Sequence, residues 1–280
     1  MMLRPSIEFD ALGTHWWIEL PEETDGDIVK SKIIERVMTF QNDYSRFIPN
    51  SYIGKLNSTK RLTAPPQELL NMLIFARDMF EVSEGIFNIS VGGTLAQLGY
   101  GKSQPTAKLH TSLWGQVVMT EQEVSIPNDV EIDLGGFGKG WLIDTLGVLL
   151  KNEGYEEYVI NGGGDILVSS FEPLEFALEH PVDSSLKVGT TRIQHGALAV
   201  SSSVKRVWNQ GAKTHHHLID PRQGISSASP IVATYVRAET ALMADTMATI
   251  LLITPELRGK LTARYDLRTV LLDTTALTKH

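Results

Sequence analysis

Cysteine is absent from this chain of 280 residues. The absence excludes disulfides, thiolate metal sites and a thiol nucleophile, so any nucleophile or metal ligand must use oxygen or nitrogen. Basic residues are also few: 25 Lys and Arg stand against 33 Asp and Glu, and the net charge at pH 7 is −8. Such a chain lacks the broad basic surface that binds nucleic acid. We therefore expect no nucleic-acid partner.

Long apolar runs are missing as well. No stretch approaches the ~18 uninterrupted apolar residues of a membrane-spanning helix. Residues 1–9 lack the basic segment and apolar run that are typical of an export signal. We therefore predict a cytoplasmic protein without a membrane span. With 42% hydrophobic and 21% charged residues, the chain has the composition of an ordinary folded protein.

The order of apolar patterns predicts an α/β (α+β) fold. Residues 8–20 alternate as strands around Gly13, and helical spacing of apolar residues predicts helices over 27–40, 66–83 and 138–153 and a last helix over 239–253. Short apolar runs predict strands over 116–120, 124–126, 131–134, 157–160, 166–170, 174–180, 191–194, 197–203 and 232–238. Residues 99–112 read as a loop. No clean boundary is visible, so we predict one domain over 1–280.

The first candidate site is the glycine-rich segment Asp133–Gly140, DLGGFGKG, which opens the helix predicted from 138. Glycines allow a ligand to approach the backbone, and the N–H groups of a helix N-terminus can bind phosphate. The segment is neither a Walker A loop nor a G-x-G-x-x-G motif, because Gly140 and Trp141 follow Lys139 and the glycine spacing differs. A tight strand-to-helix turn is the alternative.

Residues 161–165, NGGGD, lie between two predicted strands. Three glycines are more than a plain hairpin needs, which a ligand close to the backbone would explain. A flexible hairpin with a bulge remains the alternative interpretation.

A histidine run, Thr214-His215-His216-His217, precedes an Asp-Pro-x-x-Gly turn that begins at Asp220. In an extended run His215 and His217 share one face and His216 takes the other. One of these imidazoles, fixed by the Asp220 turn, would suit a general base. A His-x-His zinc site lacks an obvious third ligand. A surface run without function is the third interpretation.

The helix predicted over 239–253 is apolar almost all round and should be buried. A buried Asp245 is costly without a partner. Asp245 and Thr249 lie at i and i+4, so both oxygens point to one face, as a hard cation such as Mg²⁺ requires. A capped or ion-paired aspartate near the helix start is the alternative. Together these segments suggest a phosphate-bearing ligand, an oxygen-bound metal and a histidine base.

The whole chain resembles the ApbE family of FAD:protein FMN transferases. The resemblance follows motifs in the family's order: Leu12-Gly13-Thr14, Ser45-Arg46-Phe47-x-Pro49-x-Ser51, Leu56-Asn57, Phe87–Gly92, Asp133–Gly140 with Asp144, Asn161–Asp165, Gly196–Ala199, His217–Gly224 and Ala244–Thr249. These motifs span residues 8–253, so the resemblance does not depend on one glycine loop.

The resemblance implies two interleaved lobes of mixed sheets flanked by helices, with FAD in the cleft between them. It implies Mg²⁺ held near the pyrophosphate by Asp245, Thr249 and the carbonyl of Gly138. His217 would activate a Thr or Ser hydroxyl of an acceptor protein, and AMP would leave as FMN is attached. Lys139 and Asp144 would contact the adenosine side and Phe47 the flavin ring. The other positions expected to bind FAD are Asp133, Gly135, Gly136, Gly163, Asp165 and Asp220.

Three positions depart from the family's usual pattern. Gly138 replaces a common alanine, Asn88-Ile89 replaces Asp-Pro, and Val200-Ser201-Ser202 replaces Thr-Ser-Gly. We expect them to affect the acceptor and flavin contacts more than the metal. The same residues would also serve an FAD pyrophosphatase, in which water replaces the hydroxyl. A carrier or sensor that binds FAD without turnover is the third possibility. The intact set of His217, Asp245 and Thr249 argues against it, because binding alone needs no base.

Overall fold

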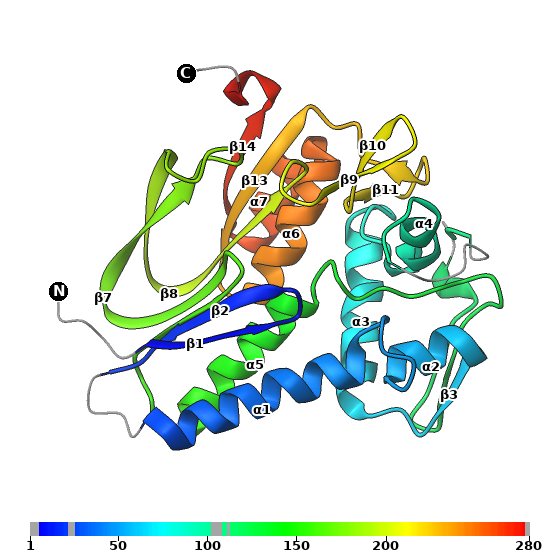
Figure 1. Cartoon of the computed structure of the whole chain (residues 1–280), viewed down its shortest axis with the longest axis horizontal. Coiled ribbons are helices and arrows are strands. Elements are labelled where there is room, and N and C mark those ends of the chain that lie inside the picture. Colours follow the sequence, from blue (N-terminus) through cyan, green and yellow to red (C-terminus); the bar gives the residue numbers. More distant parts are fainter. Residues whose placement is uncertain (1–5, 22–25, 102–107, 111–112, 278–280) are drawn as a thin grey trace. The chain divides into compact units, whose positions relative to one another are not determined.

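The structure is a computed structural model that describes residues 6–21, 26–101, 108–110 and 113–277 (Figure 1). The chain forms two compact units, each assembled from separate stretches of sequence. Unit 1 comprises Met1–Gln41, Phe137–Lys205 and Pro230–His280, and unit 2 comprises Asn42–Gly136 and Arg206–Ser229. This interleaving agrees with the two lobes that the family resemblance implied. The prediction of a single domain stays a prediction.

Unit 1 is built on a seven-stranded sheet in the order β1-β2-β6-β7-β8-β13-β14. Its strands are β1 (Ser6–Ala11), β2 (Thr14–Glu19), β6 (Tyr158–Gly162), β7 (Asp165–Glu179), β8 (Lys187–Ser202), β13 (Ile231–Ala238) and β14 (Arg268–Asp273). Every pair described in this sheet is antiparallel, so the expected mixture of strand directions is not observed. Tight hairpins join β1 to β2 and β6 to β7, which forces neighbouring strands to run in opposite directions.

Strands β7 and β8 are longer than predicted, because each joins two of the expected short strands. Their pairing continues across a register shift between Ser169 and Leu174, where the hairpin is irregular. Beyond this shift, Leu178 and Ile193 pack with Val159 and Tyr235 in a buried cluster. The Tyr235 hydroxyl donates a hydrogen bond to the Glu179 carbonyl. The distal half of the hairpin is thereby attached to the centre of the sheet.

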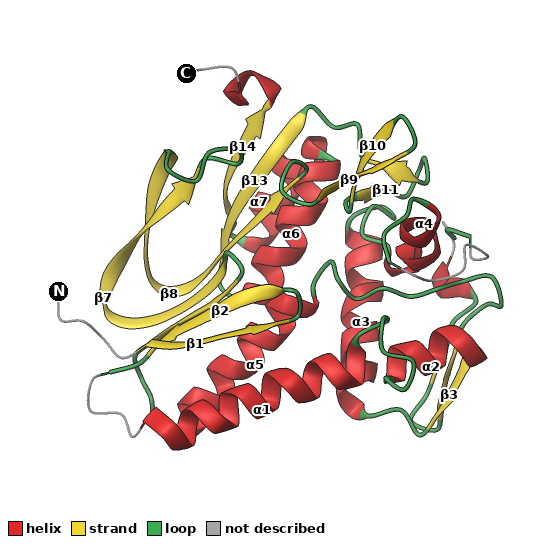
Figure 2. Cartoon of the chain, viewed as in Figure 1, coloured by secondary structure: helices red, strands yellow, loops and turns green. Residues whose placement is uncertain are grey.

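Helices α5 (Gly138–Asn152) and α6 (Ala241–Ile253) pack on each other and on the sheet, α5 against β6 and β7 and α6 against β8 and β13 (Figure 2). Both match the predicted ranges, and α6 is buried on all sides as expected. It is not the last helix, because α7 (Arg258–Tyr265) and β14 follow. Helix α7 is mostly polar, with Leu261 as its buried residue, so it lacks the apolar repeat that reveals a helix.

Helix α1 (Gly26–Tyr44) begins in unit 1 and confirms the prediction over 27–40. Its buried residues include Val29, Ile33, Val37 and Phe40, which recur at helical spacing. No helix in the described ranges of the chain combines the length and apolarity needed to cross a bilayer.

Unit 2 contains helices α2 (Tyr52–Thr59), α3 (Gln67–Val82) and α4 (Gly92–Gln97) and three small antiparallel sheets. The sheets are formed by β3 (Arg61–Thr63), β5 (Glu123–Ser125) and β4 (Val118–Met119), by β9 (Val207–Gln210) with β10 (Lys213–His216), and by β11 (Ile219–Asp220) with β12 (Ile225–Ser226). The helix predicted over 66–83 is confirmed, with Pro66 as its N-cap. The described parts of the loop predicted over 99–112 form neither helix nor strand; residues 102–107 and 111–112 lie outside the described residues.

The strand predicted over 131–134 is wrong. The Asn57 amide donates to the Ile132 carbonyl at 2.8 Å and accepts from the Ile132 N–H at 2.7 Å. The Asp133 N–H donates to the Ile89 carbonyl. One side chain thus takes the place of a neighbouring strand, so an apolar extended segment forms without a ladder.

Candidate active site

Three charged side chains meet in unit 1 and form what we call the acid cluster: Lys139, Asp165 and Asp245. Lys139 lies in the first turn of α5, Asp165 begins β7, and Asp245 lies in the second turn of α6. The Lys139 Nζ is in ion-pair contact with Asp165 and lies 3.7 Å from Asp245 Oδ2. Asp165 and Asp245 are 1% and 6% exposed. Two buried carboxylates therefore share one ammonium group.

Backbone donors complete the partners of these carboxylates. The Gly140 N–H donates to Asp245 Oδ2 at 3.1 Å, and the Val200 N–H donates to Asp165 Oδ1 at 3.3 Å. Burial, and after it the charge on Asp165, raise the pKa of Asp245 to about 7, although Lys139 and the Gly140 N–H act in the opposite direction. The cluster is short of positive charge. The ion-paired aspartate that the sequence left open is present, and the metal ligand stays a prediction.

Two hydroxyl groups lie next to each other on neighbouring elements of unit 1. Thr249 follows Asp245 by one turn of α6, and its Oγ1 lies 3.2 Å from the Oγ of Ser201 on β8. Ser201 is not among the residues predicted for the site, although it stands in a segment that departs from the family pattern. No local pattern indicates it, because its hydroxyl meets Thr249 only where α6 packs on β8.

These oxygen groups suit a hard cation better than zinc. Asp245 supplies a carboxylate, and Thr249 and Ser201 supply hydroxyls. Gly138 opens α5 two residues before Gly140, which contacts Asp245. Among the residues that the structure describes, no three His, Asp or Glu side chains form a metal-binding group, so a cation here would also need hydroxyl and carbonyl oxygens.

The glycine-rich segment Asp133–Gly140 is divided between the two units. In unit 1 it begins α5, whose N-cap residue Phe137 makes no side-chain hydrogen bond to the helix. In unit 2, Asp133 accepts the Gly135 N–H, and Gly136 packs against Phe87. The sequence presented one motif, whereas the structure shows a helix start and a separate turn.

Asp144 is directed at α6. Its two carboxylate oxygens accept the N–H groups of Ala241 at 2.8 Å and Leu242 at 2.9 Å. Burial raises the pKa of Asp144 to about 6, and these two hydrogen bonds oppose the rise. The contact with adenosine that the resemblance implies stays a prediction.

The glycines of the β6–β7 turn are explained by the protein's own packing. Gly163 and Gly164 have φ values of +70° and +99°, and a Cβ at Gly163 would lie 2.1 Å from the hydroxyl oxygen of Thr14. The Gly164 N–H donates to Asn161 Oδ1 at 2.9 Å. A tight hairpin accounts for these residues, and a contact between Gly163 and a ligand stays a prediction.

In unit 2, Arg46 joins the predicted residues Asp133 and Phe47. Its guanidinium pairs with Asp133, with 5% and 12% of the two side chains exposed, and donates to the Tyr100 carbonyl at 3.1 Å. The same group lies 4.2 Å from the centroid of the Phe47 ring. Phe47 is 55% exposed, and a Cβ at Gly101 would lie 2.6 Å from its ring. The arrangement presents a flat, partly exposed ring backed by a cation.

Further aromatic rings extend from Phe47 and form what we call the aromatic row: Phe47, Tyr100, Trp208 and His215. Successive ring centroids are 6.2, 5.0 and 6.3 Å apart. The indole N–H of Trp208 donates to the Leu98 carbonyl. We had not assigned a role to Arg46, Tyr100 or Trp208, because three separate segments supply them and no local pattern connects these segments.

The three histidines have different environments. His215 is 9% exposed and lies against Trp208. His216 donates from Nε2 to the Ser227 carbonyl at 3.0 Å and accepts the Leu218 N–H at Nδ1, and burial, together with His215, lowers its pKa. His217 is half-buried and lies between β10 and β11. The run packs into unit 2 with one buried and two half-buried histidines, and a run without function stays an alternative interpretation.

The Asp220 turn is formed as predicted. The Asp220 carbonyl accepts the N–H groups of Gln223 and Gly224, and Gly224 has a φ of +67°. The Asp220 carboxylate pairs with Arg222 at 2.7 Å, and the hydrogen bond from Arg222 lowers the pKa of Asp220. This turn follows His217 by three residues and fixes the chain there. A contact between Asp220 and FAD stays a prediction.

Asn88, one of the three departures, has a structural role. Its Oδ1 accepts the Ser90 N–H at 2.9 Å, and its Nδ2 donates to the His110 carbonyl at 2.9 Å. An aspartate could accept the first bond but could not donate the second. The asparagine is therefore suited to the backbone that surrounds it.

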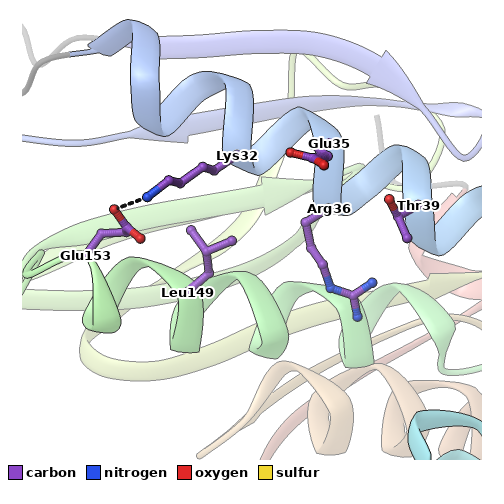
Figure 3. A pocket seen from close by; sticks show the side chains of 6 residues that line it. All are labelled: Lys32, Glu35, Arg36, Thr39, Leu149 and Glu153. Carbon is purple, nitrogen blue, oxygen red and sulfur yellow. Dashed lines mark hydrogen bonds and ion pairs between the residues drawn. The ribbon is translucent and has the colours of Figure 1, made fainter. Parts of the chain in front are cut away.

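A pocket of about 290 Å³ lies elsewhere in unit 1 (Figure 3). It is lined by residues of α1, by one residue of α5 and by the residue that follows α5: Lys32, Glu35, Arg36, Thr39, Leu149 and Glu153. Lys32 and Glu153 form an ion pair of 2.6 Å across it. None of the predicted site residues lines this pocket.

Comparisons with known proteins agree with the resemblance. Two relatives are named FAD:protein FMN transferase. The protein of Chlamydia trachomatis serovar D is 28% identical, and the alignment covers 79% of this chain and 74% of the relative. The protein of Buchnera aphidicola subsp. Schizaphis graminum is 23% identical, and the alignment covers 90% of this chain and 80% of the relative. The solved ApbE protein of Thermotoga maritima has the same fold, with a TM-score of 0.82 at 20% identity over 96% of this chain and 94% of its own. The flavin transferase ApbE of Vibrio cholerae has a TM-score of 0.79 at 19% identity over 97% and 94%.

The family profile that matches the sequence is described as the ApbE family, and it covers residues 12–271. That range includes every residue of the acid cluster and of the aromatic row. The chain belongs to the ApbE family.

Proposed function

We propose that this protein is a flavin transferase, which cleaves FAD and attaches the FMN half to a Thr or Ser hydroxyl of an acceptor protein. The acid cluster is the observation that carries the proposal. Buried carboxylates short of positive charge lie at the start of α5, where a diphosphate and a divalent cation would both be accommodated. The names of the relatives support the same activity.

Mg²⁺ fits the donors of unit 1. Asp245, Thr249 and the Gly138 carbonyl would hold it, and the two buried carboxylates with one ammonium leave negative charge for it to balance. When bound, the metal would neutralise negative charge on the diphosphate of FAD. The Ser201 hydroxyl, 3.2 Å from Thr249, would orient the threonine oxygen.

The start of α5 provides the phosphate side of the proposed site. Asp245 of α6 accepts the Gly140 N–H in this first turn, so a carboxylate oxygen already lies at the start of α5. The dipole and the N–H groups of a helix N-terminus favour an anion, and a phosphate there would be stabilised in the same way. Lys139 in the same turn adds an ammonium group.

Unit 2 would supply the ring contact and the base. The exposed Phe47 ring, backed by Arg46, suits a flat flavin ring, and His217 follows the strand that carries His215 and His216. In the transfer step His217 takes the proton of the acceptor hydroxyl, and that oxygen forms a bond to the FMN phosphorus. The bond from this phosphorus to the bridging oxygen breaks, and AMP leaves with the electron pair.

The test combines the purified protein, FAD and MgCl₂ with and without total protein from the source cells. We expect AMP to form together with a protein band that stays fluorescent after denaturation. AMP and free FMN without added protein would identify an FAD pyrophosphatase instead. Tight FAD binding without AMP under either condition would identify a carrier. The cytoplasmic location predicted from the sequence stays a prediction.

A further inference from the structure

The start of α6 is fully hydrogen-bonded within the protein. A helix leaves its first N–H groups without partners inside the helix. Here the N–H groups of Ala241 and Leu242 donate to the two oxygens of Asp144, and that of Met243 donates to the Thr240 hydroxyl at 3.2 Å. The Ala244 N–H makes the first helical bond, to the Thr240 carbonyl. Asp144 of α5 thus accepts the two N–H groups of α6 that the side chain of its N-cap residue, Thr240, does not accept.

The contact between the two helices is reciprocal. Asp144 of α5 accepts N–H groups from the first turn of α6, while Asp245 of α6 accepts the Gly140 N–H from the first turn of α5 at 3.1 Å. Each helix therefore contributes an aspartate to the other's N-terminus. The backbones approach closely at this point, since a Cβ on Gly140 would lie 2.5 Å from the Ala241 carbonyl oxygen.

The position of Asp144 on α5 agrees with this role. Gly140 and Asp144 are four residues apart, so they lie on the same face of the helix, and that face meets α6. Lys139 precedes Asp144 by five residues and projects about 140° away around the helix, at 100° per residue. The side chain that joins the acid cluster and the side chain that holds α6 therefore leave α5 in different directions.

We propose that Asp144 is a positioning residue, which holds the first turn of α6 against α5 and thereby aligns Asp245 and Thr249 at the start of α5. That this alignment serves the metal site rests on the proposed function. In this proposal Asp144 binds the backbone of α6 and not the adenosine of FAD. The two hydrogen bonds to Asp144 and the one to Asp245 form a closed link between the helices.

The matched control is Thr240→Ala. Thr240 also caps α6, but it lies on the same chain segment as the helix and makes no such link to α5. Asp144→Ala removes two acceptors, and Asp144→Asn retains one amide oxygen. We expect Tm to fall by about 2–5 °C for Asp144→Ala and for Thr240→Ala, and by less for Asp144→Asn.

Amide hydrogen exchange of the metal-free protein separates a link from a simple cap. In Asp144→Ala, exchange should increase roughly tenfold in peptides that cover 240–243 and also in those that cover 138–142, since the loosened α6 no longer holds the Gly140 N–H. In Thr240→Ala only the first region should change. Unchanged exchange over 138–142 in Asp144→Ala would overturn the proposal, whether or not the protein transfers flavin.

Ligand binding gives the second readout. Mn²⁺ alone, followed by electron paramagnetic resonance, should bind about tenfold more weakly to Asp144→Ala and within twofold of wild type to Thr240→Ala. AMP should bind both variants within twofold of wild type. Weaker AMP binding by Asp144→Ala with unchanged Tm and Mn²⁺ affinity would overturn the proposal and make Asp144 an adenosine contact. Absence of Mn²⁺ binding in the wild-type protein would contradict the proposed metal site and leave the exchange result to decide the link.

Discussion

The groups proposed for catalysis are held differently in the two units. In unit 1, Lys139 projects from the first turn of α5, Asp245 from the second turn of α6 and Asp165 from the start of β7, and both carboxylates are buried. In unit 2, Phe47 and His217 lie in loops; Phe47 is exposed and His217 is half-buried.

The difference follows from the cost of burying charge. A buried carboxylate needs partners in fixed places, and regular elements that pack on one another provide them. A ring contact and a base that must meet a second protein need access instead, and loops on a scaffold provide it. We therefore expect changes in unit 1 to alter metal dependence and stability, and changes in unit 2 to alter transfer while the fold is retained.

The largest effect should come from the acid cluster. Asp245→Ala should reduce AMP release roughly 10³-fold and remove most of the Mg²⁺ dependence, because it deletes the carboxylate among the proposed ligands. Thr249→Ala should cost about tenfold, because it removes a neutral donor. AMP formation measured across a Mg²⁺ titration checks both. Normal turnover of the Asp245 variant with an unchanged titration would contradict the metal assignment to unit 1.

In unit 2, His217→Ala should lower transfer to protein by about 10²-fold, the usual scale for a positioned base. FAD affinity, measured by quenching of flavin fluorescence, should stay within twofold of wild type. His216→Gln is the control and should retain transfer within tenfold, because both ring nitrogens of His216 serve the local backbone. The reverse order of the two variants would show that His216 is the base.

Lys139→Met tests whether unit 1 is short of positive charge. Without metal the variant leaves two buried carboxylates without their ammonium, so its Tm should fall by several degrees. Mg²⁺ alone should then raise Tm more than it does in the wild type, because no lysine competes for the carboxylates. Lys32→Met, which breaks an exposed pair, should change Tm by about 1 °C or less. Equal Mg²⁺-induced shifts in the Lys139 variant and wild type would contradict this account.

The smallest effect concerns the pH dependence contributed by His216. Burial lowers the pKa of His216 in the folded protein below the ordinary value of 6.5, so the unfolded chain binds a proton on this residue more strongly than the folded protein does. Stability from this residue is therefore complete above pH 6.5 and is lost as the pH falls from there through the lowered pKa of the folded state. His216→Gln should lose less Tm than wild type between pH 7.5 and 5.5. Parallel Tm curves for the two proteins would show that His216 does not contribute.

The sequence by itself determined the principal helices and the family. The repeats of α1, α3, α5 and α6 are local, and the spacing of Asp245 and Thr249 on α6 could be read directly, because helical geometry depends on neighbouring residues. The Asp220 turn could also be predicted from the sequence, since its glycine and its aspartate lie within five residues. The order of the motifs was enough to identify the family.

Only the tertiary structure decided which partners these residues have. Asp245 meets Gly140 across 105 residues of sequence, Asp144 meets Ala241 across 97, and Asn57 meets Ile132 across 75. The same kind of distant contact prevents a strand at 131–134 and brings Trp208 to Leu98. A periodic pattern shows which face of an element will be buried, but the residue opposite that face comes from another segment. Packing between distant segments selects that partner, because a buried polar group is stable only where another segment satisfies it.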